Sequence, residues 1–192
     1  MSMTQAAIDI LRAGHLAFFA AGMGTALYFD FQKLKTFSHP LNHDDIERLE
    51  KLHVWISSAF LSLWLTGLML IYVRTGFDIA TFSPKLWLKL GVMTFMLLVS
   101  SLIGAIVIPS LKAHMGQPLI TMSRGRMMLL TQIGVFSMFG WSSGLLLGSS
   151  VVLKTATWDV LLPITLFWCG LLSLGGQTLA LMIRRGYVFR AI

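Results

Sequence analysis

Residues 90–111, LGVMTFMLLVSSLIGAIVIPSL, carry no charged side chain. A helix of about 20 predominantly apolar residues is long enough to cross the hydrocarbon core of a bilayer. Uncharged stretches also cover residues 54–73, 127–153 and 160–183, and a shorter one covers residues 13–29. We therefore predict an all-α integral membrane protein with one transmembrane helical bundle over residues 1–192 and five spans, at about 6–31, 52–74, 85–109, 126–151 and 159–183.

The composition of the chain supports this class. Apolar residues make up 56% of it and charged residues 12%, whereas a soluble globular domain carries about 25% charge. The mean hydropathy of +0.76 excludes a disordered chain as well. The longest connection, residues 30–52, is too short to fold alone. Any chemistry must therefore lie within the bundle or at its edge.

The basic residues indicate how the chain is oriented. The net charge is +7, but Lys and Arg lie at the ends of the apolar stretches, which favours a topological role over a nucleic-acid partner. By the positive-inside rule the more basic side faces the cytoplasm. We therefore expect an outer N-terminus, a cytoplasmic C-terminus and contact with the lipid of a bacterial inner membrane. Ten basic residues fall on the inner side: Lys33, Lys35, Arg48, Lys51, Lys112, Arg124, Arg126, Arg184, Arg185 and Arg190. Five fall on the outer side: Arg12, Arg74, Lys85, Lys89 and Lys154.

Local signals mark several helix ends. The stretch from Asn42 to Asp45 can cap an amphipathic helix that runs into the second span. Gly76 predicts the end of that span. Ser83 followed by Pro84 predicts an N-cap and a first-turn proline for the third span, which we expect to stop near Pro109.

The sequence places few ionisable residues inside the predicted spans, and two of them are candidates for chemistry. His15 is in the apolar part of the first span, and Lys89 follows Pro84 by five residues in the third. Both spans run inward, so both side chains should lie about one helical turn below the outer interface and can face one pocket. Such residues mark function by default. In the alternative, Lys89 snorkels to the headgroups and His15 bonds a neighbouring carbonyl group.

A second histidine pair is expected on the cytoplasmic side. His53 opens the apolar part of the second span, and His114 follows the third. Antiparallel consecutive spans place these ends close together, so the two imidazoles could form a ligand pair; interfacial histidines with no such role are the alternative. His39 and His43 lie in a polar loop, where we expect them to be solvated.

These residue types suit a haem. Imidazole is an axial ligand of haem iron, and helical bundles can enclose the porphyrin. The propionates would need cations, which Arg74, Lys85 and Lys89 offer on the outer side and Arg124 with Arg126 on the inner side. We predict haem b as the cofactor and His15 as the metal ligand. The predicted cofactor-binding residues are His15, Lys89, His53, His114, Arg74 and Arg126.

The motifs HLAFFAAG at 15–22 and LWLKL at 86–90 resemble those of the HemJ-type protoporphyrinogen oxidases and the CopD-like membrane families. The motifs RLE at 48–50 and LTGL at 65–68 are similar as well, so the resemblance spans the first three predicted helices. It implies a haem-associated bundle in which His15 and Lys89 are functional, with Lys89 as the catalytic residue. HemJ-type proteins convert protoporphyrinogen to protoporphyrin.

The leading hypothesis is thus a haem-b-binding redox protein that performs electron transfer or HemJ-like oxidation on a porphyrin or quinone-like molecule. One alternative is a CopD-like metal-handling or transport protein that uses His15 and methionines. The other is a non-catalytic membrane subunit in which Gly140, Gly144 and Gly148 bind partner helices. The same glycine spacing is typical of an internal packing seam. A homo-oligomer or a partner membrane subunit is compatible with each hypothesis.

Overall fold

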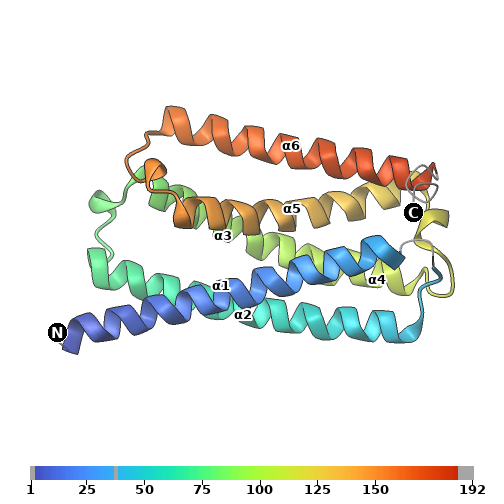
Figure 1. Cartoon of the computed structure of the whole chain (residues 1–192), viewed down its shortest axis with the longest axis horizontal. Helices are drawn as coiled ribbons and strands as arrows, with labels where there is room; N and C mark the ends of the chain where they lie inside the picture. Colours follow the sequence, from blue (N-terminus) through green and yellow to red (C-terminus); the bar gives the residue numbers. More distant parts are fainter. Residues whose placement is uncertain (1–2, 37–38, 186–192) are drawn as a thin grey trace.

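A computed structural model describes residues 3–36 and 39–185 (Figure 1). The regular elements of this part are helical, and five helical stretches are long and apolar enough to cross a bilayer. The prediction of an all-α chain with five candidate spans is confirmed. The longer helices are α1 (Met3–Thr36), α2 (His43–Thr75), α3 (Pro84–Leu102), α5 (Arg124–Ser149) and α6 (Trp158–Arg184), and the shorter elements are η1 (Ile79–Thr81), η2 (Ile103–Val107), α4 (Ile108–Lys112), η3 (Leu119–Thr121) and η4 (Val152–Lys154).

The first two helices extend beyond the apolar stretches that predict them. Helix α1 is longer than residues 6–31 at both ends, and α2 begins at His43 rather than near residue 52. Asn42 caps α2, because its side chain accepts the Asp45 N–H at 2.7 Å while the Asp45 carboxylate accepts the Asn42 N–H at 3.3 Å. The prediction of an amphipathic extension before the second span is confirmed.

The sequence predicts that the third span stops near Pro109, whereas in the structure the helix continues three residues further, to Lys112. Helix α3 continues into η2, a π-helical segment in which the N–H of Ile108 reaches the carbonyl of Ile103, and α4 then carries the chain through Pro109 to Lys112. The π-turn changes the hydrogen-bonding register just before the proline, which has no N–H to donate. The Lys112 ammonium forms an ion pair with Glu50 of α2 at 2.7 Å.

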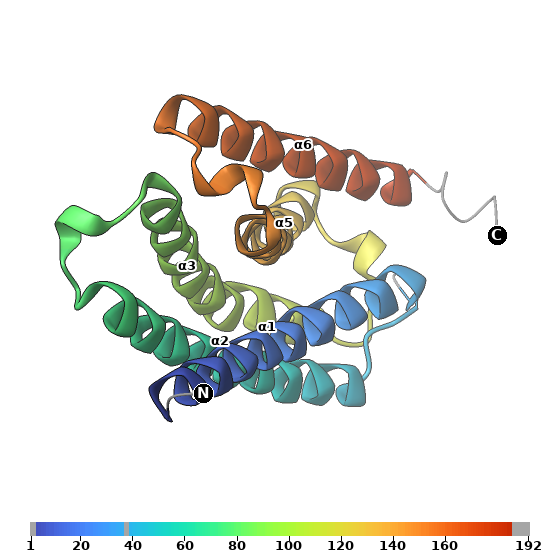
Figure 2. The ribbon, with the colours of Figure 1, turned by 60° about the vertical axis from the view of Figure 1, so that its left-hand side comes forward.

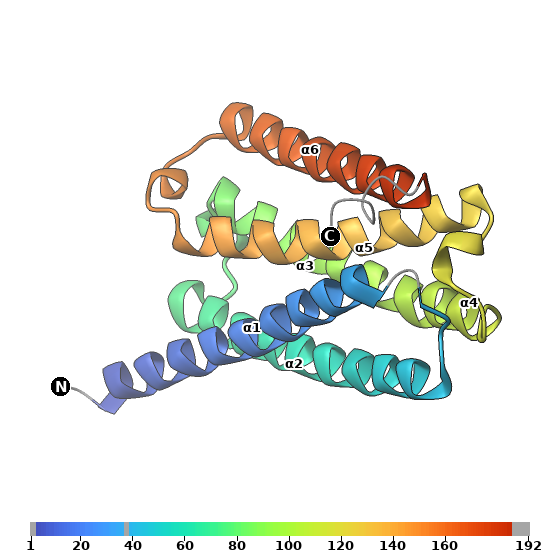
Figure 3. The same cartoon turned by 45° about the vertical axis from the view of Figure 1, so that its right-hand side comes forward.

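The long helices form two groups. Helices α1 and α2 make an antiparallel pair, whereas α5 packs between α3 and α6 (Figures 1 and 2). Figure 3 shows the pair below α5, with α6 on the far side of α5. We call the end where α1, α3 and α6 begin the His15 end, and the opposite end, where α2 and α5 begin, the His53 end.

The two groups meet around Trp141 of α5. Its indole ring makes edge-on contacts with Phe19 of α1 and Phe60 of α2, with ring centroids 5.6 Å and 6.0 Å away. A Cβ at Gly22 would lie 2.5 Å from Cη2 of this indole, so glycine permits the close approach of α1. The buried cluster that joins α2, α3 and α5 comprises Phe60, Leu63, Met96 and Trp141.

The glycine repeat of α5 serves packing within the chain at two of its three positions. Gly140 faces Met96 of α3, and Gly144 faces Phe19 of α1, whereas Gly148 faces open space. Small residues at such positions allow helices to approach closely. The repeat that the sequence offers as a seam for partner helices is therefore largely occupied by side chains of the same chain.

Polar side chains join α5 to α6. The Gln132 amide donates to the Ser173 hydroxyl at 2.9 Å, and the Gln177 amide donates to Gln132 Oε1 at 2.9 Å. Trp168 Nε1 donates to Ser142 at 2.8 Å. Interhelical hydrogen bonds of this kind satisfy polar groups that have no water partner in hydrocarbon.

Candidate functional site

His15 of α1 is held by Thr66 of α2. The distance from His15 Nδ1 to Thr66 Oγ1 is 2.9 Å. The Thr66 hydroxyl donates its proton to the backbone carbonyl of Ser62 at 2.8 Å, so its oxygen accepts from His15 Nδ1–H. In the neutral imidazole, Nε2 therefore carries the lone pair. At metal sites, one ring nitrogen of a histidine typically donates a hydrogen bond that orients the ring, and the other nitrogen binds the metal.

Gly67 of α2 leaves space for the imidazole ring of His15. A Cβ at that position would lie 3.2 Å from His15 Cε1, a tight contact that glycine avoids. The His15 side chain is half-buried between the two helices. Thr66 and Gly67 belong to the LTGL motif of the sequence, so that motif forms the wall against which His15 lies.

Lys89 of α3 lies in electrostatic range of His15 and also of Lys85 and Arg74. Lys85 donates to the Ser150 carbonyl at 2.6 Å. Lys89 is half-buried, and within the described residues it has neither an ion pair nor a hydrogen bond. The structure thus brings three predicted site residues, His15, Lys89 and Arg74, to one end of the bundle, where they form a basic site suited to an anionic group.

The second predicted histidine pair is not brought together in this way. His53 lies against the π-segment, with Nε2 3.4 Å from the position of a Cβ at Gly104. His114 lies in the loop after α4, where Nε2 is 3.2 Å from the Pro118 carbonyl and 3.0 Å from Thr121 Oγ1. Because α2 begins at His43 with the predicted extension, His53 lies about 15 Å along the helix axis from its start, where the apolar part of the helix begins.

The cations predicted for the inner side remain at the surface. Arg124 and Arg126 are exposed in the first turn of α5. Arg184 of α6 is exposed as well, and its guanidinium donates to the Met122 carbonyl at 3.3 Å. Met122 and Ile183 both line a cavity at this end.

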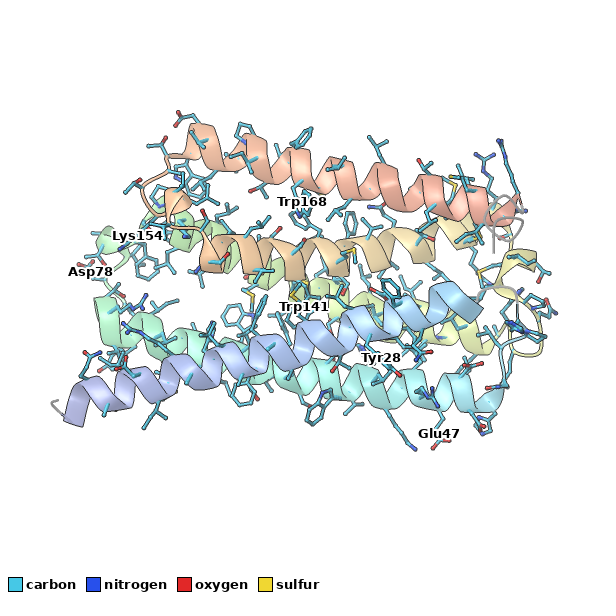
Figure 4. All side chains as sticks on the ribbon, in the orientation of Figure 1. Tyr28, Glu47, Asp78, Trp141, Lys154 and Trp168 are labelled. Atoms are coloured by element: carbon cyan, nitrogen blue, oxygen red, sulfur yellow. The ribbon has the colours of Figure 1, made fainter. Side chains whose placement is uncertain are left out.

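This cavity has a volume of about 390 Å³ and lies between the α1–α2 pair and the group α3, α5 and α6. Such a volume is in the range of small-molecule sites. Its wall is almost wholly apolar, with four methionines, Met96, Met122, Met127 and Met138. Figure 4 shows Trp141 between α5 and the α1–α2 pair, and this residue also lines the cavity.

A few polar side chains interrupt the apolar wall. Ser57 and Ser100 lie with their hydroxyl oxygens 3.1 Å apart, so that one donates to the other. His53 and Asp30 also line the cavity, and neither has a hydrogen bond or ion pair within the described part of the chain. Trp141 Nε1 is buried without a partner among residues 3–36 and 39–185.

Sequence reasoning missed most of these cavity residues. Asp30 could have been found, since it is an ionisable residue at the end of an apolar stretch. Ser57, Ser100 and Trp141 carry no comparable signal, because serines and aromatic residues are common in transmembrane helices that merely pack.

The chain therefore belongs to the class of α-helical proteins with five candidate membrane spans, and it carries a basic site at one end and an apolar cavity at the other. No protein-family model matches it, and no curated protein or solved structure shows significant similarity to it. The resemblance to the HemJ-type and CopD-like families stays a prediction from the motifs.

Proposed function

We propose that this chain is a redox protein of the bacterial inner membrane that binds b-type haem, with His15 as an axial ligand. The observation that carries the proposal is the 2.9 Å distance from His15 Nδ1 to Thr66 Oγ1, whose proton goes to the Ser62 carbonyl. From it we infer that Nδ1 carries the imidazole proton and that the Nε2 lone pair is free. Haem iron takes four ligands from the porphyrin and needs only axial ligands from the protein. A single oriented imidazole is therefore enough to begin a haem site.

Lys89 is the proposed partner of a haem propionate or of a substrate carboxylate. Its ammonium lacks a counter-ion among the described residues, and Lys85 and Arg74 add positive charge nearby. Charge pairing keeps the amine protonated, whereas direct ligation of iron would require it to lose its proton. We therefore assign Lys89 the electrostatic role.

A bound haem would supply one-electron chemistry. The residues of this chain would hold and orient it, His15 through Nε2 and Lys89 through its charge. Oxidation of protoporphyrinogen is the specific reaction that we propose on the motifs at 15–22 and 86–90. Electron transfer without a porphyrin substrate is the simpler form of the same proposal.

The test is the absorption spectrum of protein purified in mild detergent. We expect a Soret band in the wild type, its loss in His15→Ala, and its retention in His53→Ala and His39→Ala. Thr66→Val removes the oxygen that accepts from His15 while it keeps a similar shape. Loss of such a partner typically lowers metal affinity about 10-fold or more, so this variant should bind less haem at equal supply.

Two results would contradict the proposal. A wild-type protein that never shows a Soret band, even after reconstitution with haemin, does not bind haem. A spectrum that survives in His15→Ala but is lost in His53→Ala or His114→Ala would place the haem at the His53 end.

A further inference from the structure

Asp30 places a carboxylate in the wall of the apolar cavity. It lies near the end of α1, within the candidate span Gln5–Gln32, and it lines the cavity at the His53 end. Within the described part of the chain it has neither a hydrogen bond nor an ion pair. A carboxylate removed from water is costly unless a positive charge or hydrogen-bond donors compensate it. A cationic ligand in the cavity would supply the missing charge.

The register of the antiparallel α1–α2 pair gives the level at which Asp30 lies. Ala26 of α1 and Ile56 of α2 pack against the same buried cluster, and both line the cavity. In an antiparallel pair, a step forward along one helix corresponds to a step back along the other. Asp30, four residues after Ala26, therefore lies level with Leu52, four residues before Ile56. Leu52 also lines the cavity.

The apolar wall extends from this level toward the middle of the bundle. Leu52 and Phe60 of α2 both line the cavity, and the eight residues between these levels span about 12 Å of α-helix. Met96 and Trp141 line the cavity at its inner level, where they form a buried cluster with Phe60. The cavity therefore suits a ligand with a charged group at one end and an apolar body that extends into the bundle.

The other charged groups around the cavity do not neutralise Asp30. Its lining among the described residues contains no Lys or Arg, and His53 forms no ion pair with Asp30 there. The Asp45 carboxylate, also in the lining, takes part in the cap of α2. The nearby cation Lys112 is already paired with Glu50. An anionic ligand would meet two carboxylates in this wall, so charge favours a cation.

We propose that this cavity binds an amphiphilic organic cation, whose positive group lies beside Asp30 and whose apolar body contacts the methionine-lined wall. Methionine side chains are flexible and polarisable, so such a wall adapts to apolar bodies of different shape. The inference goes beyond the proposed haem site and does not rest on it, since the cavity lining includes neither His15 nor Lys89.

The first test is calorimetric titration of the full-length protein, in an uncharged detergent, with octyltrimethylammonium. Asp30→Asn keeps the shape of the side chain and removes its charge. This variant should bind about 10-fold more weakly or worse, because opposite charges attract strongly away from water. Asp44→Asn is the matched control, since Asp44 is exposed near the start of α2 and lies outside the cavity lining. It should bind as the wild type does, whereas wild-type affinity in Asp30→Asn would overturn the proposal.

The second test reverses the charge of the ligand. Octanesulfonate carries the same alkyl chain as octyltrimethylammonium with a negative group at its end, and it should bind to the wild type about 10-fold more weakly or worse. Equal affinities for the two amphiphiles would mean that the protein takes up the alkyl chain regardless of charge, and would overturn the proposal.

The third test fills the cavity. Gly134 of α5 lines it, and a Cβ at this position would meet nothing within 4 Å. Gly134→Leu should therefore fold and lose octyltrimethylammonium binding. Gly148→Leu on the same helix also meets open space, but it lies outside the cavity, so this control should retain binding.

Equal heats in the wild type and in Gly134→Leu would mean that the cation only partitions into detergent, and would overturn the proposal. Saturable binding that persists in haem-free His15→Ala supports the cation site and separates its outcome from that of the haem proposal.

Discussion

At the scale of single residues, Lys89 is a cation that has no counter-ion within the part of the chain that the structure describes. It is half-buried within a candidate span and faces other basic groups rather than an acid. An ammonium in such a place is costly unless it reaches water or meets an anion. Substitution at this position can distinguish the possible roles.

Lys89→Arg and Lys89→Met separate these roles. If Lys89 pairs with a propionate or a substrate carboxylate, arginine should retain haem and methionine should lower haem affinity, because only arginine keeps the charge. An iron ligand would instead shift the Soret band in both variants. The measurement is haem content and Soret position of each purified protein. Unchanged haem content and redox activity in Lys89→Met would contradict both functional roles and leave a lysine that snorkels.

Some residues of the two candidate sites can be selected from the sequence, and others cannot. His15 and Lys89 can be selected from the sequence, because ionisable groups are rare inside apolar stretches. Trp141 cannot, since an aromatic residue in a span is ordinary packing. Its unsatisfied N–H becomes visible only when the neighbours on α1, α2 and α3 are known.

At the scale of the elements, the sequence predicts a helix end correctly where a capping residue at that end determines it. Asn42, Gly76 and Ser83 cap α2 and α3 as their side chains or backbone freedom indicate, and Gly76 adopts the left-handed conformation with φ of 59°. The prediction near Pro109 falls three residues short of the helix end at Lys112, because a preceding π-turn lets the helix pass through the proline. The register of that turn depends on packing between helices, which a local signal does not contain.

Gly22 is a position where a single added methyl group should affect how two helices pack. In Gly22→Ala the new Cβ would meet the indole of Trp141, which Phe19 and Phe60 hold in place. Helix α1 would have to move away, at a cost of about 1–3 kcal/mol. The measurement is the free energy of unfolding in mixed micelles.

Gly24→Ala is the matched control for Gly22→Ala. A Cβ at Gly24 meets nothing within 4 Å, so this variant should be at least as stable as the wild type. Equal stability of the two variants would show that α1 does not depend on close contact with Trp141.

At the scale of the whole molecule, the sequence predicts the number of helices but not their neighbours. Helices that are apolar on most of their surface carry no single stripe that would identify the face toward the core. Residues 54–73 and 160–183 are both uncharged throughout, yet α2 pairs with α1 and contributes to the cavity wall over much of its length, whereas α6 packs mainly against α5. The cavity arises from this pairing, and so it could not be derived from hydropathy.

Orientation in the membrane is the prediction that belongs to this scale. A reporter fused after Ile192 should be cytoplasmic, and one inserted near Gly76 should be on the outer side, because ten of the fifteen basic residues lie on the predicted inner side. Alkaline phosphatase and green fluorescent protein fusions measure the two locations. An outer C-terminus would reverse the bundle and place the basic site around His15 toward the cytoplasm.

The π-turn of η2 has a consequence for how this chain can evolve. A π-turn holds one residue more than the α-helical turn it replaces, so deletion of one codon within Ile103–Val107 would restore a regular helix. Because the π-turn fits the additional residue within one turn, the deletion would leave Ser100 beside Ser57 and Lys112 beside Glu50. Sequence gaps of one residue at this position are therefore expected among related chains that keep both the serine pair and the ion pair.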